Sequence, residues 1–397
     1  MFLNNLIKCT FCLLALINAI SVNGTLSPKS PKSKKGKHSV DKVHSGPQNQ
    51  NVKDKNLITQ TVKIADILSN YQAFFKEVDA YSFDGLVLGY VTPWNNHGYD
   101  VAKIFGNKFT HISPVWLQVR CIKPAQYEIT GTHDVDKQWI LDVKNAGKER
   151  GVKVVPRILF DKWSLKDFQQ LLGNYNEMYA LTAAIVESCK KYNFDGVVLE
   201  VWSQITNRFD DSLLVDLIKH IGKKFSSEQL DLFLVVPPKR GMQEEMFTGK
   251  NFDDLYDYVT GFSLMTYDFS NPQRPGPNAP LPWVKDCIQF LSSSQEKRKK
   301  ILTGLNFYGN AYTPNGGSPI VAHDYVELLK NSRTKELKFD PESVEHFFEA
   351  KTDSGRSIVF YPTLHSINER INLARKYGTG ISIWELGQGL DYFYDLL

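Results

Sequence analysis

The chain has 397 residues, of which 42% are hydrophobic, 12% aromatic and 23% charged, and its formal net charge is +4. This length suffices for one large domain or two ordinary ones with a sizeable core. The composition excludes a fibrous protein and a wholly disordered one.

The first 24 residues have the layout of a secretory signal peptide. The stretch MFLNNLIKCTFCLLALINAISVNG places one lysine before an apolar run and ends in small or polar residues. A short membrane anchor is the alternative, but the run from Cys9 to Val22 is short for a bilayer span and no later segment qualifies. We therefore expect residues 1–24 to be removed and the protein to enter the secretory pathway.

Residues 25–55 form a lysine-rich segment with almost no apolar side chains. Such a segment cannot offset the entropy of ordering by burial, so we predict that it is disordered. Up to residue 55 the chain has nine Lys, two Asp and neither Arg nor Glu, a balance of +7 that leaves −3 for the remainder. A solvated linker is the favoured interpretation, and a contact for heparin-like glycans or acidic surfaces is the alternative. The mildly acidic remainder argues against nucleic-acid binding.

Three cysteines, Cys121, Cys189 and Cys287, remain after the predicted cleavage. Their odd number and scattered positions allow at most one bridge and indicate no disulfide framework. Because no CxxC motif or Cys/His cluster occurs in this part of the sequence, we predict neither a metal site nor a cofactor.

A helical lead-in is expected at residues 56–80, and over residues 81–397 short β-rich runs alternate with helical patterns. Each run is apolar on both faces, as in strands that are buried on both sides. The eight runs are GLVLGYV (85–91), FTHISPVW (109–116), VKVVPRILF (152–160), GVVLEVW (196–202), LDLFLVVP (230–237), YVTGFSLMTYD (258–268), KILTGLNFYG (300–309) and GISIWEL (380–386). Eight strand–helix units predict an α/β fold, the (β/α)8 or TIM barrel.

Two of the intervening helices carry additional signals. After the fourth run, Asp210 or Asp211 is placed to cap a helix. Its apolar stripe consists of Leu214, Leu217, Ile218, Ile221 and Phe225. Before the eighth run, Ser366 and Glu369 have the spacing of a capping box.

The rhythm breaks between the seventh and eighth strands. There the runs ELKFD, EHFFEAK and SIVFYP alternate polar and apolar residues, and TDSG (352–355) supplies a turn. We predict a small antiparallel insertion at about residues 311–362, beside the barrel mouth.

The carboxyl ends of the strands, where such barrels hold their reactive side chains, are rich in aromatic residues and carboxylates. They read TPW (92–94), SPVW (113–116), LEVW (199–202), MTYD (265–268), LNFYG (305–309) and IWE (383–385). Rings pack on the C–H bonds of sugars and acids accept hydroxyl protons, so this set is typical of a carbohydrate site. The alternative is that the rings plug the barrel top; four tryptophans together with MTYD favour the site.

The stretches KFTHISPVW, FDGVVLEVW, GFSLMTYDF, LTGLNFYG and GISIWELGQG resemble, in order and spacing, glycoside hydrolase family 18, the chitinases and chitinase-like lectins. The resemblance covers about residues 80–397. For animal members it implies a secreted or lysosomal location and a scavenger-receptor partner of the stabilin type.

The active-site strand of this family reads DGxDxDxE. On FDGVVLEVW its first two positions fall on Asp195 and Gly196, and its later acidic positions fall on Val198, Glu200 and Trp202. In the family the outermost Glu protonates the glycosidic oxygen, and the Asp two residues deeper steers the N-acetyl group of the substrate into attack. The resemblance therefore implies that this machinery has changed.

Strand alternation puts Val198, Glu200 and Trp202 on one face, which we expect to point into the barrel with Trp202 nearest the mouth. An indole has no acidic proton at neutral pH. Glu200 would lie roughly 6 to 7 Å from the position of the acid, beyond the hydrogen-bond reach of about 3 Å. We therefore predict no catalytic residue; Glu200 is either a buried hydrogen-bonded acid, which we favour, or an acceptor for a sugar hydroxyl.

The resemblance also assigns a binding wall. It places Tyr267 and Asp268 against the central sugar and its acetamido group, Trp384 at the stacking floor and Tyr90 at the rim of the first strand. The predicted carbohydrate-binding set is Tyr90, Glu200, Trp202, Tyr267, Asp268 and Trp384.

A less secure rim set comprises Trp94, Trp116 and Met265, for which core packing is the alternative. Arg274 and Trp283 lie in the Pro-rich loop after the sixth strand, where a solvated loop is the favoured interpretation over ligand contact.

Three functions follow from these features. The leading hypothesis is a secreted, non-catalytic lectin for chito-oligosaccharides or bacterial glycans such as lipopolysaccharide. The second is a glycoside hydrolase that uses Glu200 or Asp268 on an unusual substrate. The third is an adaptor in lysosomal or secretory sorting, whose tail or insertion contacts a stabilin-type scavenger receptor.

Overall fold

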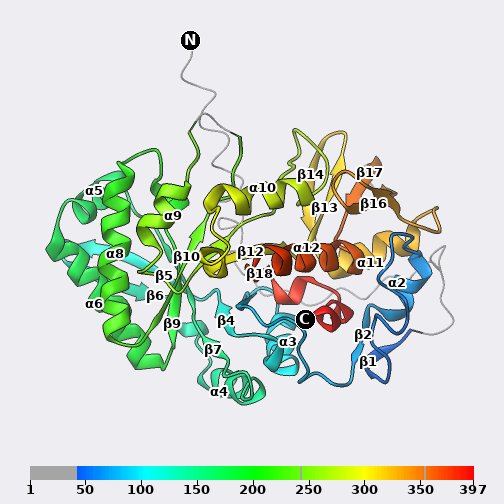
Figure 1. The fold of residues 1–397 in the computed structure, drawn as a ribbon, viewed down its shortest axis with the longest axis horizontal. Coiled ribbons are helices and arrows are strands. Elements are labelled where there is room, and N and C mark those ends of the chain that lie inside the picture. The colour runs from blue at the N-terminus through cyan, green and yellow to red at the C-terminus, as the bar shows by residue number, and fades with distance from the viewer. Residues whose placement is uncertain (1–42, 242–243, 353–354) are drawn as a thin grey trace, which may run out of the picture. The chain divides into compact units, whose positions relative to one another are not determined.

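The computed structural model describes residues 43–241, 244–352 and 355–397 (Figure 1). The predicted signal peptide and residues 25–42 of the predicted tail lie outside the described residues. The described strands form an eleven-stranded sheet, a five-stranded sheet and a two-stranded sheet.

Each of the eight predicted runs contains a strand of the large sheet. These strands are β3 (Val87–Val91), β4 (His111–Pro114), β7 (Lys153–Val154) with β8 (Arg157–Phe160), β9 (Gly196–Glu200), β10 (Asp231–Val236), β11 (Gly261–Leu264), β12 (Ile301–Asn306) and β18 (Gly380–Trp384). Neighbouring strands are parallel and follow the order β8-β9-β10-β11-β12-β18-β3-β4-β7.

The third run brings the two ends of this order together, because β7 and β8 are separated by only two residues. The N–H of Val155 donates to the Ile112 carbonyl of β4 at 2.9 Å, and the N–H of Val198 in β9 donates to the Pro156 carbonyl at 3.0 Å. The sheet therefore curls back on itself, and the predicted α/β, TIM-barrel-like class is confirmed. A hairpin of β5 (Leu117–Lys123) and β6 (Gln126–Thr130) extends the wall, with β5 parallel to β8.

Helices cover the outside of the curled sheet (Figure 1). They are α3 (His97–Ile104), α4 (Lys137–Ala146), α5 (Leu165–Leu172), α6 (Tyr175–Tyr192), α7 (Trp202–Ile205), α8 (Asp211–Ser227), α9 (Gly249–Leu255), α10 (Leu281–Leu291) and α12 (Leu364–Tyr377). The predicted stripe of α8 is buried, and Asp210 caps this helix by accepting from the N–H of Ser212 at 2.8 Å. The predicted cap of α12 is wrong: Thr363 caps the helix, and Ser366 is its capping-box partner.

The barrel interior holds its own apolar cluster, separate from the larger core between sheet and helices. Its members are Leu88, Tyr90, Val115, Val155, Val198, Phe233, Val235 and Leu302, with Leu86, Met265 and Trp384 packed against them. Because Val198 belongs to this cluster, the face of β9 that carries Val198 and Glu200 points inward, as predicted.

Between β12 and β18 the chain forms the five-stranded antiparallel sheet. Its strands are β13 (Gly309–Thr313), β14 (Gly316–Ile320), β15 (Lys338–Asp340), β16 (Glu345–Thr352) and β17 (Gly355–Phe360), and α11 (Ala322–Asn331) lies among them in the chain. The strand order is β14-β13-β17-β16-β15.

The described segment before the barrel has regular structure. It contains β1 (Ser45–Gln48), α2 (Ile64–Asn70) and β2 (Gln72–Phe75), and β1 pairs with β2. The carboxylate of Asp395 accepts from the N–H groups of Val52 at 3.1 Å and Phe75 at 2.8 Å. The predicted disorder is therefore wrong for residues 45–48, because backbone pairing and a distant carboxylate supply the contacts that the local composition lacks.

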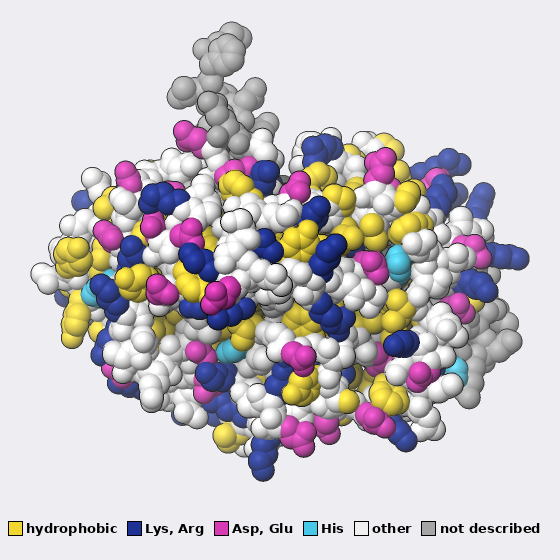
Figure 2. Space-filling model, in the orientation of Figure 1, with side chains coloured by type: hydrophobic (Ala, Val, Ile, Leu, Met, Phe, Trp, Pro, Cys, Tyr) yellow, Lys and Arg dark blue, Asp and Glu magenta, His cyan; other side chains and the backbone are white. Residues whose placement is uncertain are grey.

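Charged side chains of both signs are interspersed over the face of the molecule in Figure 2. None of the described helices is both long and apolar enough to cross a membrane. Cys121, Cys189 and Cys287 are free thiols in the described part of the chain.

Candidate functional site

The inward-facing strand ends bring several predicted site residues together at the mouth of the barrel. Tyr90 of β3 and Trp384 of β18 have ring centroids 5.2 Å apart with planes tilted by 54°. Tyr90 is 3% exposed, and its hydroxyl donates to Ser263 Oγ at 2.8 Å. Burial raises the pKa of this hydroxyl well above its usual range, so it stays a donor. Tyr90 therefore supports the half-buried Trp384 rather than offering a free face of its own.

Glu200, at the end of β9, forms an ion pair with Arg157 of β8. The Nε of Arg157 lies 2.7 Å from Oε2 of Glu200, and the two side chains are only 15% and 14% exposed. Strand register places Arg157 beside Val198, which lies two residues deeper in the barrel than Glu200. The guanidinium therefore reaches toward the mouth to contact the carboxylate. Glu200 is thus the hydrogen-bonded acid that we favoured. Arg157 was not among the predicted site residues. The available signal was a single arginine in the apolar run VKVVPRILF, at a position whose side chain shares the inward face of the strand.

Trp202 does not lie at the mouth, and its predicted sugar contact is wrong. The strand ends at Glu200, Val201 leaves the extended conformation at φ −136° and ψ −30°, and α7 begins at Trp202. The alternation of strand side chains therefore stops before this residue. The indole is 1% exposed, donates from Nε1 to the Met246 carbonyl at 2.6 Å, and packs 4.9 Å from the Phe247 ring in the core outside the barrel.

Tyr267 and Asp268 follow β11 at the mouth, as predicted from the motif MTYD. Asp268 is exposed as a residue and adopts φ +56°, but its carboxylate turns toward the Tyr308 hydroxyl, which donates to Oδ1. The backbone N–H of Asp268 donates to Asn278 Oδ1 at 2.6 Å, and Arg240 Nη1 donates to its carbonyl at 2.8 Å. The atoms packed around the carboxyl group raise the pKa of Asp268, while the Tyr308 hydrogen bond opposes this shift.

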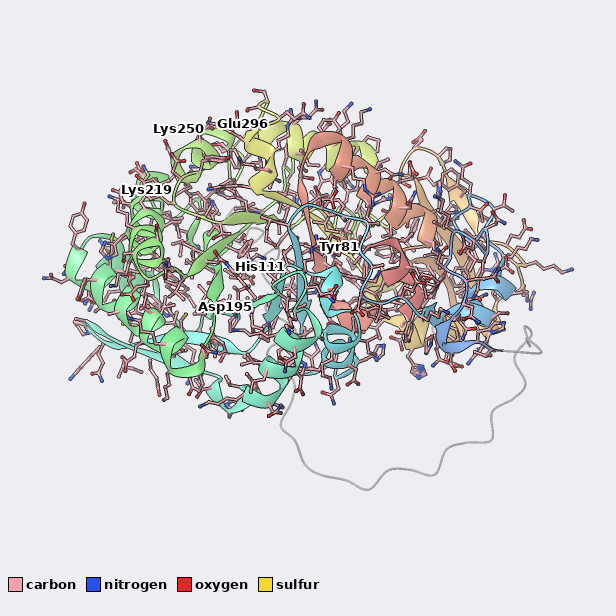
Figure 3. The ribbon with its side chains drawn as sticks, turned by 60° about the horizontal axis from the view of Figure 1, so that its bottom comes forward. Tyr81, His111, Asp195, Lys219, Lys250 and Glu296 are labelled. Carbon is pink, nitrogen blue, oxygen red and sulfur yellow. The ribbon has the colours of Figure 1, made fainter. Side chains whose placement is uncertain are left out.

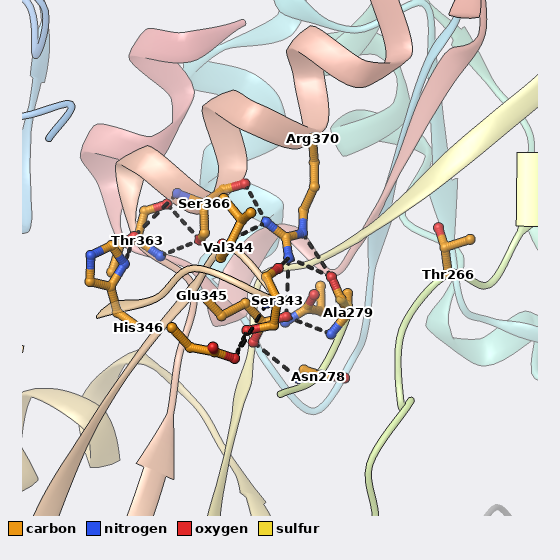
Figure 4. A network of polar contacts seen from close by, with 12 residues as sticks. Thr266, Asn278, Ala279, Ser343, Val344, Glu345, His346, Thr363, Ser366 and Arg370 are labelled. Atoms are coloured by element: carbon orange, nitrogen blue, oxygen red, sulfur yellow. Dashed lines mark hydrogen bonds and ion pairs between the residues drawn. The ribbon is translucent and has the colours of Figure 1, made fainter. Parts of the chain in front are cut away.

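A buried ion pair supports this segment from outside the mouth (Figure 4). Glu345 of β16 accepts from the N–H groups of Asn278 at 3.0 Å and Ala279 at 2.6 Å. Arg370 of α12 lies 3.1 Å from Glu345 and also donates to the Ser366 carbonyl at 2.8 Å. The pair thus holds the loop whose Asn278 side chain binds the backbone of Asp268. No local motif marked Glu345 or Arg370, which are distant from Asp268 in the sequence.

The three less secure rim residues differ in their burial and contacts. Trp116 is fully buried and donates from Nε1 to the Tyr99 hydroxyl at 2.6 Å, so core packing holds and its predicted rim role is wrong. Trp94 is 67% exposed in the loop after β3. Met265 packs against the interior cluster. In the loop after β11, Arg274 lies over the ring of Phe269. Trp283, predicted in the same loop, lies in the first turn of α10 and donates to the Lys239 carbonyl at 2.8 Å.

A further buried acid, Glu385, follows Trp384 directly. It is 0% exposed; Asn95 Nδ2 lies 2.5 Å from Oε1, and the N–H of Gly387 donates to Oε2 at 3.1 Å. Burial raises the pKa of Glu385 to about 7, against these two hydrogen bonds. Glu385 therefore ties the loop of the exposed Trp94 to the strand that carries Trp384.

The first aspartate of the family signature, Asp195, directly precedes β9 and so lies at the amino-terminal end of this strand (labelled in Figure 3). Asp195 accepts from the N–H of Val154 and forms an ion pair with Lys144, both at 2.7 Å. Nearby, Asp231 pairs with His111 at 3.2 Å and Lys153 at 2.6 Å. In barrels of this type the amino-terminal face contributes stability rather than chemistry, so these groups are structural.

A hollow of about 900 Å³ lies beside the loops that follow β9 and β10, and its lining does not include the aromatic residues of the mouth. Three of its four acidic lining residues are already engaged: Asp210 caps α8, Asp211 accepts from Asn251, and Glu245 accepts from the N–H groups of Arg240 and Gly241. The fourth, Glu244, is exposed. The mouth, with its aromatic rings and the partly exposed side chains of Arg157 and Glu200, is the better candidate for a ligand site.

Residues 86–389 match the family model described as Glycosyl hydrolases family 18. The chain therefore belongs to this family. A curated relative, Probable chitinase 2 of Drosophila melanogaster, is 23% identical over 256 residues, which cover 58% of this chain and 51% of the relative. The chain thus spans about half the length of this relative.

Solved structures share the fold at low identity. The chitinase of Chromobacterium violaceum superposes with a TM-score of 0.66 at 19% identity, covering 79% of this chain and 97% of that one. A GH18 chitinase mutant of Cycas revoluta in complex with (GlcNAc)4 gives 0.65 at 15% identity, covering 78% and 97%. The spore cortex-lytic enzyme SleL of Bacillus cereus gives 0.63 at 15% identity, covering 79% and 73%.

Proposed function

We propose that this family 18 protein is a non-catalytic lectin that binds oligosaccharides of the chito-oligosaccharide or bacterial glycan class at the barrel mouth. The observation that carries the proposal is the Arg157–Glu200 ion pair, together with the turn of the chain into α7 directly after it. Where the family strand presents its outermost acid, this chain has turned Trp202 into the core.

Hydrolysis by the family route needs a carboxyl proton within hydrogen-bond reach of the glycosidic oxygen. Glu200 is held as an acceptor by Arg157, and Val198 replaces the deeper carboxylate with a methyl-bearing side chain. Glu385 has both oxygens hydrogen-bonded and none of its surface exposed. These positions support binding without turnover.

The alternative is a hydrolase in which Asp268 supplies the proton. The raised pKa of Asp268 favours this role, but the Tyr308 hydroxyl already donates to its carboxylate. Glu200, the other acid of this alternative, is less suited because it is ion-paired.

Binding and turnover of chitotetraose by the purified chain separate these functions. The lectin proposal expects saturable binding that Trp384→Ala weakens and no release of shorter sugars over a long incubation. Cleavage by the wild-type chain that Asp268→Asn abolishes would establish the hydrolase instead.

The strand signatures resemble those of animal chitinase domain-containing protein 1, the stabilin-interacting chitinase-like protein. On this resemblance and the apolar leader we also propose a secreted or lysosomal location and capture by a stabilin-type scavenger receptor. The lysine-rich tail or the antiparallel sheet between β12 and β18 is the proposed contact. Receptor capture that survives deletion of residues 25–42 would exclude that part of the tail.

A further inference from the structure

Arg157 carries more hydrogen-bond donors than the protein uses. Its Nε donates to Glu200, and within the described residues neither Nη nitrogen donates to any protein group. The side chain is 15% exposed, so most of it lies out of water. Buried polar groups are normally paired, and a charged one left open is costly.

The open edge lies among the residues of the mouth. Strand register pairs Arg157 with Val198, a member of the interior cluster that also contains Tyr90. Arg157 and Glu200 also act electrostatically on the hydroxyls of Tyr90 and Tyr267. Glu200 holds the guanidinium from its Nε side, so the fork formed by the two Nη groups keeps a defined orientation.

We propose that Arg157 recognises an anionic substituent, a carboxylate, phosphate or sulfate, on a sugar bound in the barrel mouth. This inference rests on the proposed function and names the class of glycan that the site prefers. A planar fork of N–H groups pairs with two oxygens of one anionic group, whereas a neutral hydroxyl offers one acceptor.

The charges around the site set the size of the effect. Glu200 cancels much of the long-range field of Arg157, and the carboxylate of Asp268 is engaged by Tyr308. An anionic ligand therefore gains from directed, partly desolvated hydrogen bonds rather than from a positive field. Charge-assisted bonds of this kind contribute about 1.5 to 3 kcal/mol, which corresponds to a preference of about tenfold or more.

Displacement of fluorescent chitotetraose from the full chain tests the inference. The competitors are N-acetylglucosamine, its 6-sulfate, its 6-phosphate and N-acetylmuramic acid, which share one ring and differ in charge. We expect at least one charged sugar to displace the probe at about one tenth of the concentration that N-acetylglucosamine needs. The ranking of the three charged sugars then identifies the anionic group.

Variants separate recognition from structure. Arg157→Gln should remove the preference for charged sugars over N-acetylglucosamine, and Arg157→Lys should keep part of this preference. Because Arg157→Gln leaves Glu200 unpaired, the double variant Arg157→Gln/Glu200→Gln is measured beside it, with melting temperatures for both. Arg333→Gln, at an exposed arginine between α11 and β15, is the matched control and should change nothing.

Two results would overturn the inference: equal displacement by all four sugars, or a charged preference that survives in Arg157→Gln and in Arg157→Gln/Glu200→Gln. Failure of the proposed function looks different. In that case chitotetraose does not bind the wild-type chain, or its binding is the same in Trp384→Ala.

Discussion

Arg370 of α12 and Glu345 of β16 lie 3.1 Å apart with almost no exposed surface, and together they fix the loop that holds Asp268. This relationship ties the antiparallel sheet between β12 and β18 to the mouth of the barrel. It also implies that the site depends on residues far from any sugar.

Replacing Arg370 by Met should destabilise the protein by about 3–5 kcal/mol, because it leaves the Glu345 carboxylate buried without its charged partner. Urea unfolding measures this loss. In the same sample, chitotetraose affinity should fall because Asn278 no longer holds the backbone of Asp268 firmly. Lys338→Met, at an exposed ion pair of the same small sheet, is the control and should change stability by less than about 1 kcal/mol. Equal effects of the two variants would contradict the assigned role.

Trp202→Ala should cost about 3–5 kcal/mol of stability and leave glycan affinity unchanged, because the indole fills the core outside the barrel. Denaturant unfolding and calorimetric titration on one preparation give both quantities. Trp202→Phe keeps most of the packing and loses the bond to Met246, so about 1 kcal/mol is expected. A drop in glycan affinity without a drop in stability would contradict this assignment and indicate that Trp202 contacts the ligand at the mouth.

The triple variant Val198→Asp/Glu200→Asp/Trp202→Glu rebuilds the acidic positions of the family strand. Restoring them is necessary for chitinase activity on the lectin proposal, but the structure adds that it should not be sufficient. The chain leaves the strand after Glu200, so a glutamate at 202 would enter the core instead of the mouth. Assays of chitotetraose cleavage should stay at background. Measurable turnover by this variant would show that the chain after β9 can reorient.

Trp384→Ala should weaken chitotetraose binding about tenfold or more, because a rigid aromatic face is lost at the stacking floor. Trp94→Ala, at the exposed rim, should have a smaller effect. Tyr175→Ala removes an equally exposed ring on α6 and serves as the control. Fluorescence or calorimetric titration of the three variants gives the ranking, and an unchanged affinity for Trp384→Ala would place the groove elsewhere.

Glu385 should make the protein more stable at mildly acidic pH than at neutral pH. Its pKa is about 7 in the folded state and about 4.5 in the unfolded chain, so the folded state keeps a proton that the unfolded state has lost. Its contribution is full below pH 4.5, declines as the pH rises through 7, and amounts to about 3 kcal/mol. Unfolding curves of the wild type and Glu385→Gln between pH 4.5 and 8 isolate this contribution: the stability of the wild type relative to the variant should decline as the pH rises.

His346 should act in the opposite sense. It is 1% exposed between the Gln60 carbonyl and the Thr363 hydroxyl, both at 2.9 Å, and burial lowers its pKa to about 4. In the unfolded chain this histidine takes up a proton near pH 6.5, whereas in the folded state it stays neutral until about pH 4. The free energy of unfolding therefore falls as the pH drops from 6.5 to 4. His346→Gln should reduce this loss in acid unfolding experiments. If the loss of stability between pH 6.5 and 4 is the same in this variant as in the wild type, other groups cause it.

The eight apolar runs and the helical stripe of α8 were readable in the sequence because strand and helix periodicity are local properties of the chain. The motif MTYD likewise placed Tyr267 and Asp268 after a strand. By contrast, Trp202 and Trp116 lie next to strand ends, where the local pattern does not decide which way a side chain faces. A break in backbone direction after Glu200 turns Trp202 into the core. Trp116 is held in the core by its hydrogen bond to the Tyr99 hydroxyl.

The sequence by itself determined the family and the barrel class, because each depends on residue type at fixed spacing. Tertiary structure alone decided that Arg157 binds Glu200, that Glu345 and Arg370 hold the Asp268 loop, and that residues 45–48 form a strand against 72–75. These contacts join segments that are distant in the chain, and their energies come from burial and charge pairing that no local pattern records.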